Sequence, residues 1–211
     1  MLEKYSIPKP NHPNQFLLNP VSMNFNLSGL YLLTGNSGSG KTLLGRSMAN
    51  LLPLNLQYSG SILRSNNRSK IKYAPQFATD FFVDHESIIS NLKVIALESF
   101  FNFESEKSTL LGYLPQFGLT DISERLSVPV KSLSAGMKYR LMLLCSIMKN
   151  PEFLIIDEPF ASLDEKTSAD ILTVLLNHHR KTNMGMMIIS HLIPENLPDT
   201  FERIHLKNGL A

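Results

Sequence analysis

The sequence is poor in cysteine, in charged residues and in long apolar runs. Its single cysteine, Cys145, excludes an internal disulfide, and its place in the apolar run 141–145 indicates a buried side chain rather than a reactive thiol. No apolar run approaches the ~18 residues that a membrane-spanning helix needs. The first 20 residues contain four prolines and lack the apolar stretch of a secretory signal. We therefore expect a cytoplasmic chain that reaches a membrane only through a partner.

Charged residues make up only 18% of the chain, below the ~25% usual for soluble domains. The 20 basic and 18 acidic residues nearly cancel, and the net charge of +2 does not favour a dedicated nucleic-acid-binding protein. The basic side chains of Arg64, Arg68, Lys70 and Lys72 are interpreted as a solvated connection between strands. The low charge predicts instead that a partner protein normally covers part of the surface.

Length and hydrophobic patterning indicate one folded domain covering residues 1–211. Hydrophobic residues make up 43% of the chain, which excludes bulk disorder, and 211 residues fit a single large domain. Short, continuously apolar segments, typical of strands buried on both faces, alternate with segments of helical periodicity. We predict strands at 30–34, 57–62, 71–74, 153–156, 186–189 and 204–206, and helices at 41–52, 134–148 and 165–181. This alternation predicts an α/β fold with a mainly parallel sheet.

Two regions depart from this alternation. The first 20 residues are rich in proline and asparagine, and we expect them to be irregular, with at most an edge strand. The stretch 77–133 carries mostly helical patterns, strongest between Ser87 and Leu126, and predicts an inserted helical subdomain.

A glycine-rich loop follows the first buried strand and opens a helix. It fits the pattern G-x-x-x-x-G-K-[ST], whose small residues let backbone N–H groups curl around phosphate oxygens. In such a loop the lysine reaches the β- and γ-phosphates, and the final hydroxyl ligates Mg²⁺. The alternative, a flexible turn with a stray lysine, does not account for the strand and helix on either side. The predicted nucleotide-binding residues are Gly35, Asn36, Ser37, Gly38, Ser39, Gly40, Lys41 and Thr42.

Two carboxylates follow the apolar strand predicted at 153–156. In open α/β folds, ligands bind at the carboxyl edge of the sheet, which is where Asp157 and Glu158 are placed. Asp157 is a candidate to hold Mg²⁺, directly or through water, and Glu158 is a candidate general base for the attacking water. Acidic residues after a strand often mark only a solvated turn. The functional interpretation of this pair therefore depends on the phosphate loop in the same chain.

With four further motifs, these segments resemble the ATP-binding cassette (ABC) ATPases over nearly the whole chain. The matches, in the family's order, are the phosphate loop 35–42, a glutamine loop 73–76, a signature segment 133–137, the Asp-Glu-Pro segment 157–159, a D-loop 162–164 and a switch segment 189–191. The resemblance implies a P-loop NTPase fold with a mainly parallel sheet, an N-terminal antiparallel β part and an inserted helical subdomain.

The resemblance implies roles in catalysis for four residues. Gln76 would contact Mg²⁺ or the attacking water, and His191 would contact the γ-phosphate, alongside Lys41 and Glu158. Considered without the resemblance, Gln76 is equally a polar residue at a strand end and His191 a histidine in a loop.

The resemblance also implies that each site is shared between two molecules. Ser134 and Gly136 would bind the γ-phosphate held by the phosphate loop of a second copy, with Asp164 at the interface. A serine hydroxyl and backbone N–H groups at a helix start suit an anion. Ser134 alone is also an ordinary helix N-cap.

The implied function is an ATP-binding and ATP-hydrolysing subunit of a membrane transporter, with ATP and Mg²⁺ as ligands. Two copies would close head-to-tail on ATP binding. Separate transmembrane permease subunits would hold the protein at the inner face of the membrane. The alternatives are a soluble ABC ATPase acting on nucleic acid or ribosomes, and a degenerate cassette with weak hydrolysis. The near-neutral charge and the lack of a heptad run between Gln76 and Leu133 favour the transporter.

Several positions depart from the family's usual pattern. Ala135 and Met137 replace a glycine and a glutamine of the signature. Leu43, which completes the predicted nucleotide-binding segment, stands where a second hydroxyl usually approaches the α-phosphate. Losing one neutral hydrogen bond costs about 1 kcal/mol, so we expect weaker binding and slower turnover. The candidates to stack on adenine are Phe16 and Tyr5.

Overall fold

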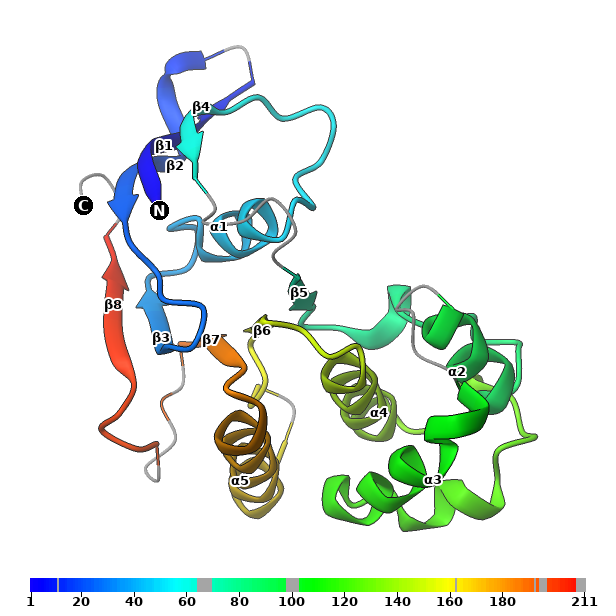
Figure 1. The fold of residues 1–211 in the computed structure, drawn as a ribbon. Helices are drawn as coiled ribbons and strands as arrows, with labels where there is room; N and C mark the ends of the chain where they lie inside the picture. The colour runs from blue at the N-terminus through cyan, green and yellow to red at the C-terminus, as the bar shows by residue number, and fades with distance from the viewer. Residues whose placement is uncertain are drawn as a thin grey trace.

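The computed structural model describes residues 1–10, 12–63, 70–97, 103–161, 163–191, 193 and 197–207. A three-stranded antiparallel sheet and a five-stranded parallel sheet are combined with helices (Figure 1). The strands are β1 (Leu2–Lys9), β2 (His12–Met23), β3 (Leu30–Gly35), β4 (Ser59–Ile62), β5 (Ile71–Ala74), β6 (Phe153–Asp157), β7 (Gly185–Ile189) and β8 (Glu202–Leu206). The α-helices are α1 (Lys41–Met48), α2 (Ile88–Leu97), α3 (Phe103–Tyr113), α4 (Ala135–Met148) and α5 (Glu165–Thr182).

The parallel sheet has the strand order β5-β6-β7-β3-β8, and every neighbouring pair in it is parallel. The central strands β6 and β7 are buried at every position because both faces are covered, whereas the edge strand β8 carries charged, exposed residues. Leu154 and Ile156 of β6 join the apolar cluster formed with α4 and α5, whereas Ile155 joins a second cluster with α1 and the antiparallel sheet. The predicted α/β fold with a covered parallel sheet is confirmed.

The N-terminal segment is more regular than we expected. It forms the antiparallel pair β1–β2, and β4 pairs with the other edge of β1. Prolines are tolerated there because β2 is an edge strand, and because the register of β1 against β2 shifts on both sides of Pro8. The expectation of an irregular start was therefore wrong, whereas the edge strand that we allowed for is present as β2, and so is the antiparallel β part implied by the family resemblance.

Most helix and strand predictions agree with the structure to within two residues, but α1 ends at Met48 rather than at position 52. Ala49 caps the helix, and Asn50 adopts a left-handed conformation with φ of +61°, which stops the helical path. Cys145 is buried in α4 as predicted, and burial raises the pKa of its thiol to about 12.

Between β5 and α4 the chain is helical, with α2, α3 and the short 3₁₀ helices Ala78–Asp80, Leu114–Phe117, Thr120–Glu124 and Val130–Ser132. In Figure 1 this region extends away from the antiparallel sheet and lies beside α4. Its buried side chains, among them Leu92, Leu110 and Phe117, share one apolar cluster with α4 and α5. None of the helices described is long and apolar enough to cross a bilayer.

Candidate active site

The phosphate loop connects β3 to α1 at the carboxyl edge of the parallel sheet. Gly40 precedes the helix with φ of +93°, a conformation that side chains other than glycine's strain to adopt. A Cβ at Gly40 would lie 2.8 Å from Leu18 Cδ1 and 2.9 Å from the Leu17 carbonyl oxygen, so β2 packs directly on the loop. Packing of β2 therefore restricts the conformation of the loop, and the N-terminus of α1 faces the place where the loop would bind an anion.

Lys41 is largely buried, and its ammonium group bends back over the loop. Lys41 Nζ donates hydrogen bonds to the carbonyl oxygens of Gly35 at 2.8 Å and Asn36 at 2.9 Å. The positive charge is therefore already positioned over the loop that is predicted to receive phosphate oxygens.

Asp157, at the end of β6, is buried and meets two hydroxyl groups. Its Oδ2 accepts hydrogen bonds from Thr42 Oγ1 at 2.8 Å and from Tyr73 OH at 2.6 Å, whereas Oδ1 is buried with no partner among the described residues. Burial raises the pKa of the Asp157 carboxyl group, and the bonds from Tyr73 and Thr42 oppose that rise. Burial and the neighbouring Asp157 raise the pKa of Tyr73, so its phenol stays protonated and donates.

This donor set fits Mg²⁺, a hard cation that prefers oxygen ligands and usually keeps several waters. Thr42, whose hydroxyl group is bonded to Asp157, lies at the end of the phosphate loop and lines a cavity together with Gln76, while the second oxygen of Asp157 is buried without a partner among the described residues. These are the three residues predicted from the sequence to hold the metal.

Glu158 has a left-handed backbone, with φ of +49°, and its N–H donates to the Ile189 carbonyl oxygen at 2.8 Å. Its Oε2 lies 2.9 Å from His191 Nδ1 and accepts hydrogen bonds from Ser190 Oγ at 3.2 Å and from the His191 N–H at 3.4 Å. The switch segment at the end of β7 therefore holds the carboxylate that follows β6.

A cavity of about 1040 Å³ is lined by most of these groups, but Asp157 is not among its lining residues. Of the residues predicted to bind the nucleotide in one chain, Ser39 does not line it; the lining includes Gly35, Asn36, Ser37, Gly38, Gly40, Lys41, Thr42, Leu43, Gln76, Glu158 and His191. Sequence reasoning missed Leu17, Thr34, Ile193 and His205 in the same lining. The Thr34–His205 pair, 3.1 Å from Oγ1 to Nδ1, depends on the pairing of β3 with β8 and carries no motif.

The adenine-stacking candidates do not reach this cavity. Tyr5 is 1% exposed and stacks with Tyr58, with 5.3 Å between the ring centroids, which excludes it as a ligand of the base. Phe16 pairs with Pro8 across the β1–β2 ribbon, and its neighbour Leu17 lines the cavity instead.

Ser134 and Gly136 lie outside this cavity, at the start of α4. Ser134 is exposed and caps the helix by accepting a hydrogen bond from the Met137 N–H at 3.2 Å. A Cβ added at Gly136 would meet nothing within 4 Å. The Met137 side chain packs on the apolar cluster below, so the substituted signature residue has a structural role.

Asp164, predicted at an interface, is the N-cap of α5. It is exposed, and its side chain accepts hydrogen bonds from the N–H and hydroxyl groups of Thr167 at 2.9 and 2.6 Å. Ser162 of the same motif lies outside the described residues, as do Arg64 and Arg68 of the basic stretch.

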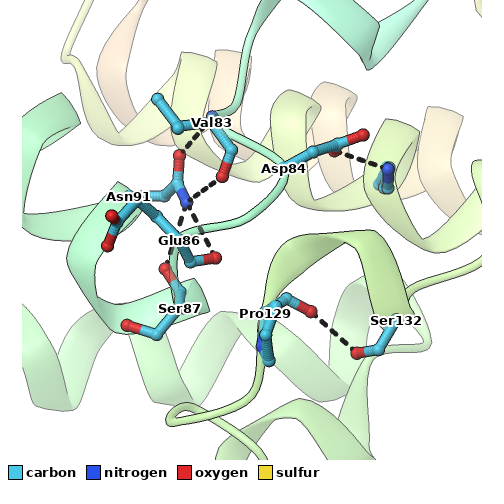
Figure 2. A network of polar contacts seen from close by, with 8 residues as sticks. Val83, Asp84, Glu86, Ser87, Asn91, Pro129 and Ser132 are labelled. Carbon is cyan, nitrogen blue, oxygen red and sulfur yellow. Dashed lines mark hydrogen bonds and ion pairs between the residues drawn. The ribbon is translucent and has the colours of Figure 1, made fainter.

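Polar contacts fasten the segment after the glutamine loop to α2 and α4. Figure 2 shows the Asn91 amide bridging the backbone of Val83 and Ser87, with its Oδ1 accepting from the Val83 N–H at 2.7 Å and its Nδ2 donating to the Val83 and Ser87 carbonyl oxygens at 3.1 Å. Asp84, within this segment, forms an ion pair of 2.6 Å with Lys138 of α4. The start of α4 is thus linked to the helical region near Gln76.

Comparison with known proteins agrees with these observations. The family model described as ABC transporter matches residues 18–161. The chain is 29% identical over 191 residues to the lantibiotic transport ATP-binding protein SrtF of Streptococcus pyogenes, covering 89% of this chain and 79% of that protein. It is 27% identical to the ABC transporter ATP-binding protein YejF of Escherichia coli, of whose length it spans about a third, 36%.

Solved structures show the same fold. The ATP-binding cassette MJ0796, in a dimeric structure bound to ADP and Pi, superposes with a TM-score of 0.77 at 19% identity, over 99% of this chain and 94% of that one. The cassette cbiO1 of Clostridium perfringens, part of the cbiONQ transporter complex, gives a TM-score of 0.73 at 20% identity, over 100% of this chain and 87% of that one.

Proposed function

The chain belongs to the ABC transporter family as an ATP-binding cassette, and from this premise we propose that it hydrolyses MgATP to power a membrane transporter. The observation that carries the proposal is the single cavity in which the phosphate loop meets Gln76, Glu158 and His191. These residues come from four separate stretches of the chain, and only the fold brings them together. Hydrolysis of a nucleotide needs phosphate binding, metal binding and water activation in one place.

In this proposal Lys41 exchanges its loop carbonyl partners for the β- and γ-phosphates. Thr42, Asp157 and Gln76 would hold Mg²⁺, which would supply charge that stabilises the phosphate oxygens. Glu158 accepts a proton from the attacking water, and the bonds from Ser190 and His191 keep its carboxylate in place.

We assign the exposed start of α4 to a second copy of this chain. Ser134 and Gly136 offer a hydroxyl group and free backbone space at the N-terminus of a 14-residue helix, away from the chain's own phosphate loop. A head-to-tail pair would place the start of one α4 against the phosphate loop of the other copy and would form two identical sites. Asp164, exposed at the start of α5, is proposed to lie at this interface.

The helical region is proposed to dock on separate permease subunits, holding the protein at the cytoplasmic face of the membrane. A groove of about 400 Å³ is lined there by apolar and polar side chains, among them Val83, Val94 and Ile95. Val83 and Val94 are 61% and 55% exposed, and Phe77 nearby is 62% exposed. These exposed apolar side chains, in a chain with few charged residues, support the proposal of a docking surface here.

Substitution of Glu158 tests the hydrolytic role. Glu158→Gln keeps the shape of the side chain but removes the base, so we expect ATPase activity to fall by about 10²-fold or more while nucleotide binding persists. Glu165→Gln, at an exposed position in the first turn of α5, is the matched control and should retain activity. Equal rates for Glu158→Gln and wild type would show that the chain is not the hydrolytic partner.

The transporter assignment is tested by the partner that accompanies the protein. Purification from detergent-solubilised membranes is expected to recover a multi-span membrane protein, and to lose it when Val83 and Val94 are both changed to aspartate. Recovery of ribosomes or DNA alone would overturn the transporter assignment.

A further inference from the structure

Asp157 accepts hydrogen bonds from two hydroxyl groups, of which one is assigned to the metal and the other is not. Thr42 lies on α1 at the end of the phosphate loop, and its oxygen is assigned to the metal. Tyr73 lies on β5, does not line the nucleotide cavity, and still donates the shorter bond, 2.6 Å, to the same Asp157 oxygen. The glutamine-loop motif gives Tyr73 no role of its own.

Tyr73 is firmly placed by its surroundings. In the sheet it pairs with Ile155, two residues before Asp157 on β6. Its ring passes under α1 where Gly45 leaves room: an added Cβ there would lie 3.3 Å from Tyr73 Cε2. The guanidinium carbon of Arg46 lies 5.9 Å from the ring centroid, over its face. A ring enclosed by a strand, a helix and a cation can hold its hydroxyl group in one position.

The two oxygens of Asp157 differ in their partners. Oδ1 is buried and has no partner among the described residues, while Oδ2 takes both hydroxyl bonds. A carboxylate with one oxygen tethered and one free is oriented for a further ligand. If Thr42 alone tethered Oδ2, any movement of Thr42 toward a metal would release the carboxylate. With Tyr73 present, the tether does not depend on Thr42.

We propose that Tyr73 is a positioning residue for the metal, holding Oδ2 of Asp157 so that Oδ1 is kept for Mg²⁺ or its bound water. The inference rests on the proposed function, because it presumes that Thr42 and Asp157 bind Mg²⁺ with the nucleotide. Residues that orient metal ligands without touching the metal commonly set its affinity.

Tyr73→Phe removes only the hydroxyl group and tests this role by nucleotide binding, without hydrolysis. Binding of a fluorescent ATP analogue is measured in EDTA and then across a Mg²⁺ titration. In EDTA, we expect the affinity of Tyr73→Phe for the analogue to stay within about twofold of wild type. The Mg²⁺ concentration that gives half of the Mg²⁺-dependent change in binding should rise about tenfold or more. Mn²⁺ substituted for Mg²⁺ gives a second readout, because its EPR signal reports the bound metal directly.

Tyr31→Phe is the matched control. Tyr31 is buried in β3 of the same sheet, and its hydroxyl group also has a hydrogen bond, accepted from the Asn26 N–H at 2.7 Å. Melting curves compare the stability of the two variants. If Tyr73→Phe and Tyr31→Phe give the same Mg²⁺ dependence as wild type, Tyr73 has no positioning role. If wild type itself fails to bind the analogue in either condition, the proposed function fails instead.

Discussion

The phosphate loop and the start of α4 are both suited to anions at a helix N-terminus, yet the chain supports them differently. At the loop, Lys41 is held by carbonyl oxygens, and Thr42 is bonded to Asp157. At α4, the Ser134 hydroxyl bonds its own helix and no other part of the chain that the structure describes, and the space around Gly136 is open. The first region is preorganised within one molecule, whereas the second presents a bare surface. The contrast is what we expect if, as proposed, the chain supplies one half of each of two shared sites.

Mixing two inactive variants gives the strongest test of that contrast. Lys41→Ala disables the phosphate loop and Ser134→Ala the start of α4, and each should lower ATPase activity by about 10²-fold or more, because each removes a group that stabilises transition-state charge. In a head-to-tail pair, a mixed dimer has one site with both residues intact. In an equal mixture about half of the dimers are mixed, and each of these has one of its two sites intact. The mixture should therefore recover about a quarter of wild-type activity.

The control for mixing is Lys41→Ala combined with a Lys41→Ala, Ser134→Ala double variant, a mixture that contains no intact site. It should stay inactive at every protein concentration. Failure of the first mixture to rise above either single variant would place both residues in a site within one chain.

A matched pair of glycine substitutions gives the next largest effect. Gly40→Ala meets Leu18 and the Leu17 carbonyl group in a left-handed conformation, so it should cost about 1–3 kcal/mol of folding free energy and weaken ATP binding at least about tenfold. Gly136→Ala meets nothing and favours the helix, so a single chain should bind ATP as wild type does.

The two alanine variants separate binding from assembly. Isothermal titration of dilute protein measures ATP binding, and light scattering in the presence of ATP measures dimer assembly. Gly136→Ala should impair only the ATP-dependent dimer. Loss of ATP binding by monomeric Gly136→Ala would contradict the assignment of this residue to a second copy.

The same contrast explains which parts of the site were readable from the sequence. The phosphate loop and the Asp157–Glu158 pair are local in the chain, and their spacing alone predicts their chemistry. Strands such as β6 and β7 were predicted closely because burial on both faces leaves a continuous apolar run. Leu17 and His205 reach the cavity only through strand pairing, which leaves no motif. Tyr73 belongs to the glutamine-loop segment, but that motif does not predict its hydrogen bond to Asp157.

The missed features of the fold have similar causes. The prolines of the N-terminal segment argue against a central strand, and they cannot reveal that the strand carrying them lies at an edge or shifts its register. The helical pattern after Lys41 continues past Met48, but the left-handed turn at Asn50 ends the helix first. Local periodicity predicts which segments are buried, whereas tertiary packing decides where they stop.

A smaller effect is expected within the helical region, where Asn91 of α2 holds the segment before it. Asn91→Ala leaves the Val83 N–H and carbonyl groups without their side-chain partner, so folding free energy should fall by about 1–3 kcal/mol. Nucleotide affinity of the single chain should not change, because Asn91 is absent from the cavity lining. Urea unfolding and ATP titration measure the two quantities. Asn177→Ala changes the same residue type on α5, and should lower stability far less, because the Asn177 side chain accepts one exposed hydrogen bond, from Arg180.

The smallest effect concerns the base of the nucleotide. Apart from the phosphate loop, the cavity is lined by Leu17, Thr34 and His205 among others, with no phenylalanine, tyrosine or tryptophan among its lining residues in the described part of the chain. Stacking on an aromatic ring is worth about 1–3 kcal/mol per base and is shared by all bases, whereas strong discrimination needs hydrogen-bonding groups matched to one base. We therefore expect ATP and GTP to bind within about tenfold of each other. Competition titrations measure the ratio of the two affinities. Leu17→Tyr places an aromatic ring in the cavity lining and should strengthen the binding of both ATP and GTP. A preference for ATP of about 10³-fold or more would show that a side chain of this wall reads adenine directly.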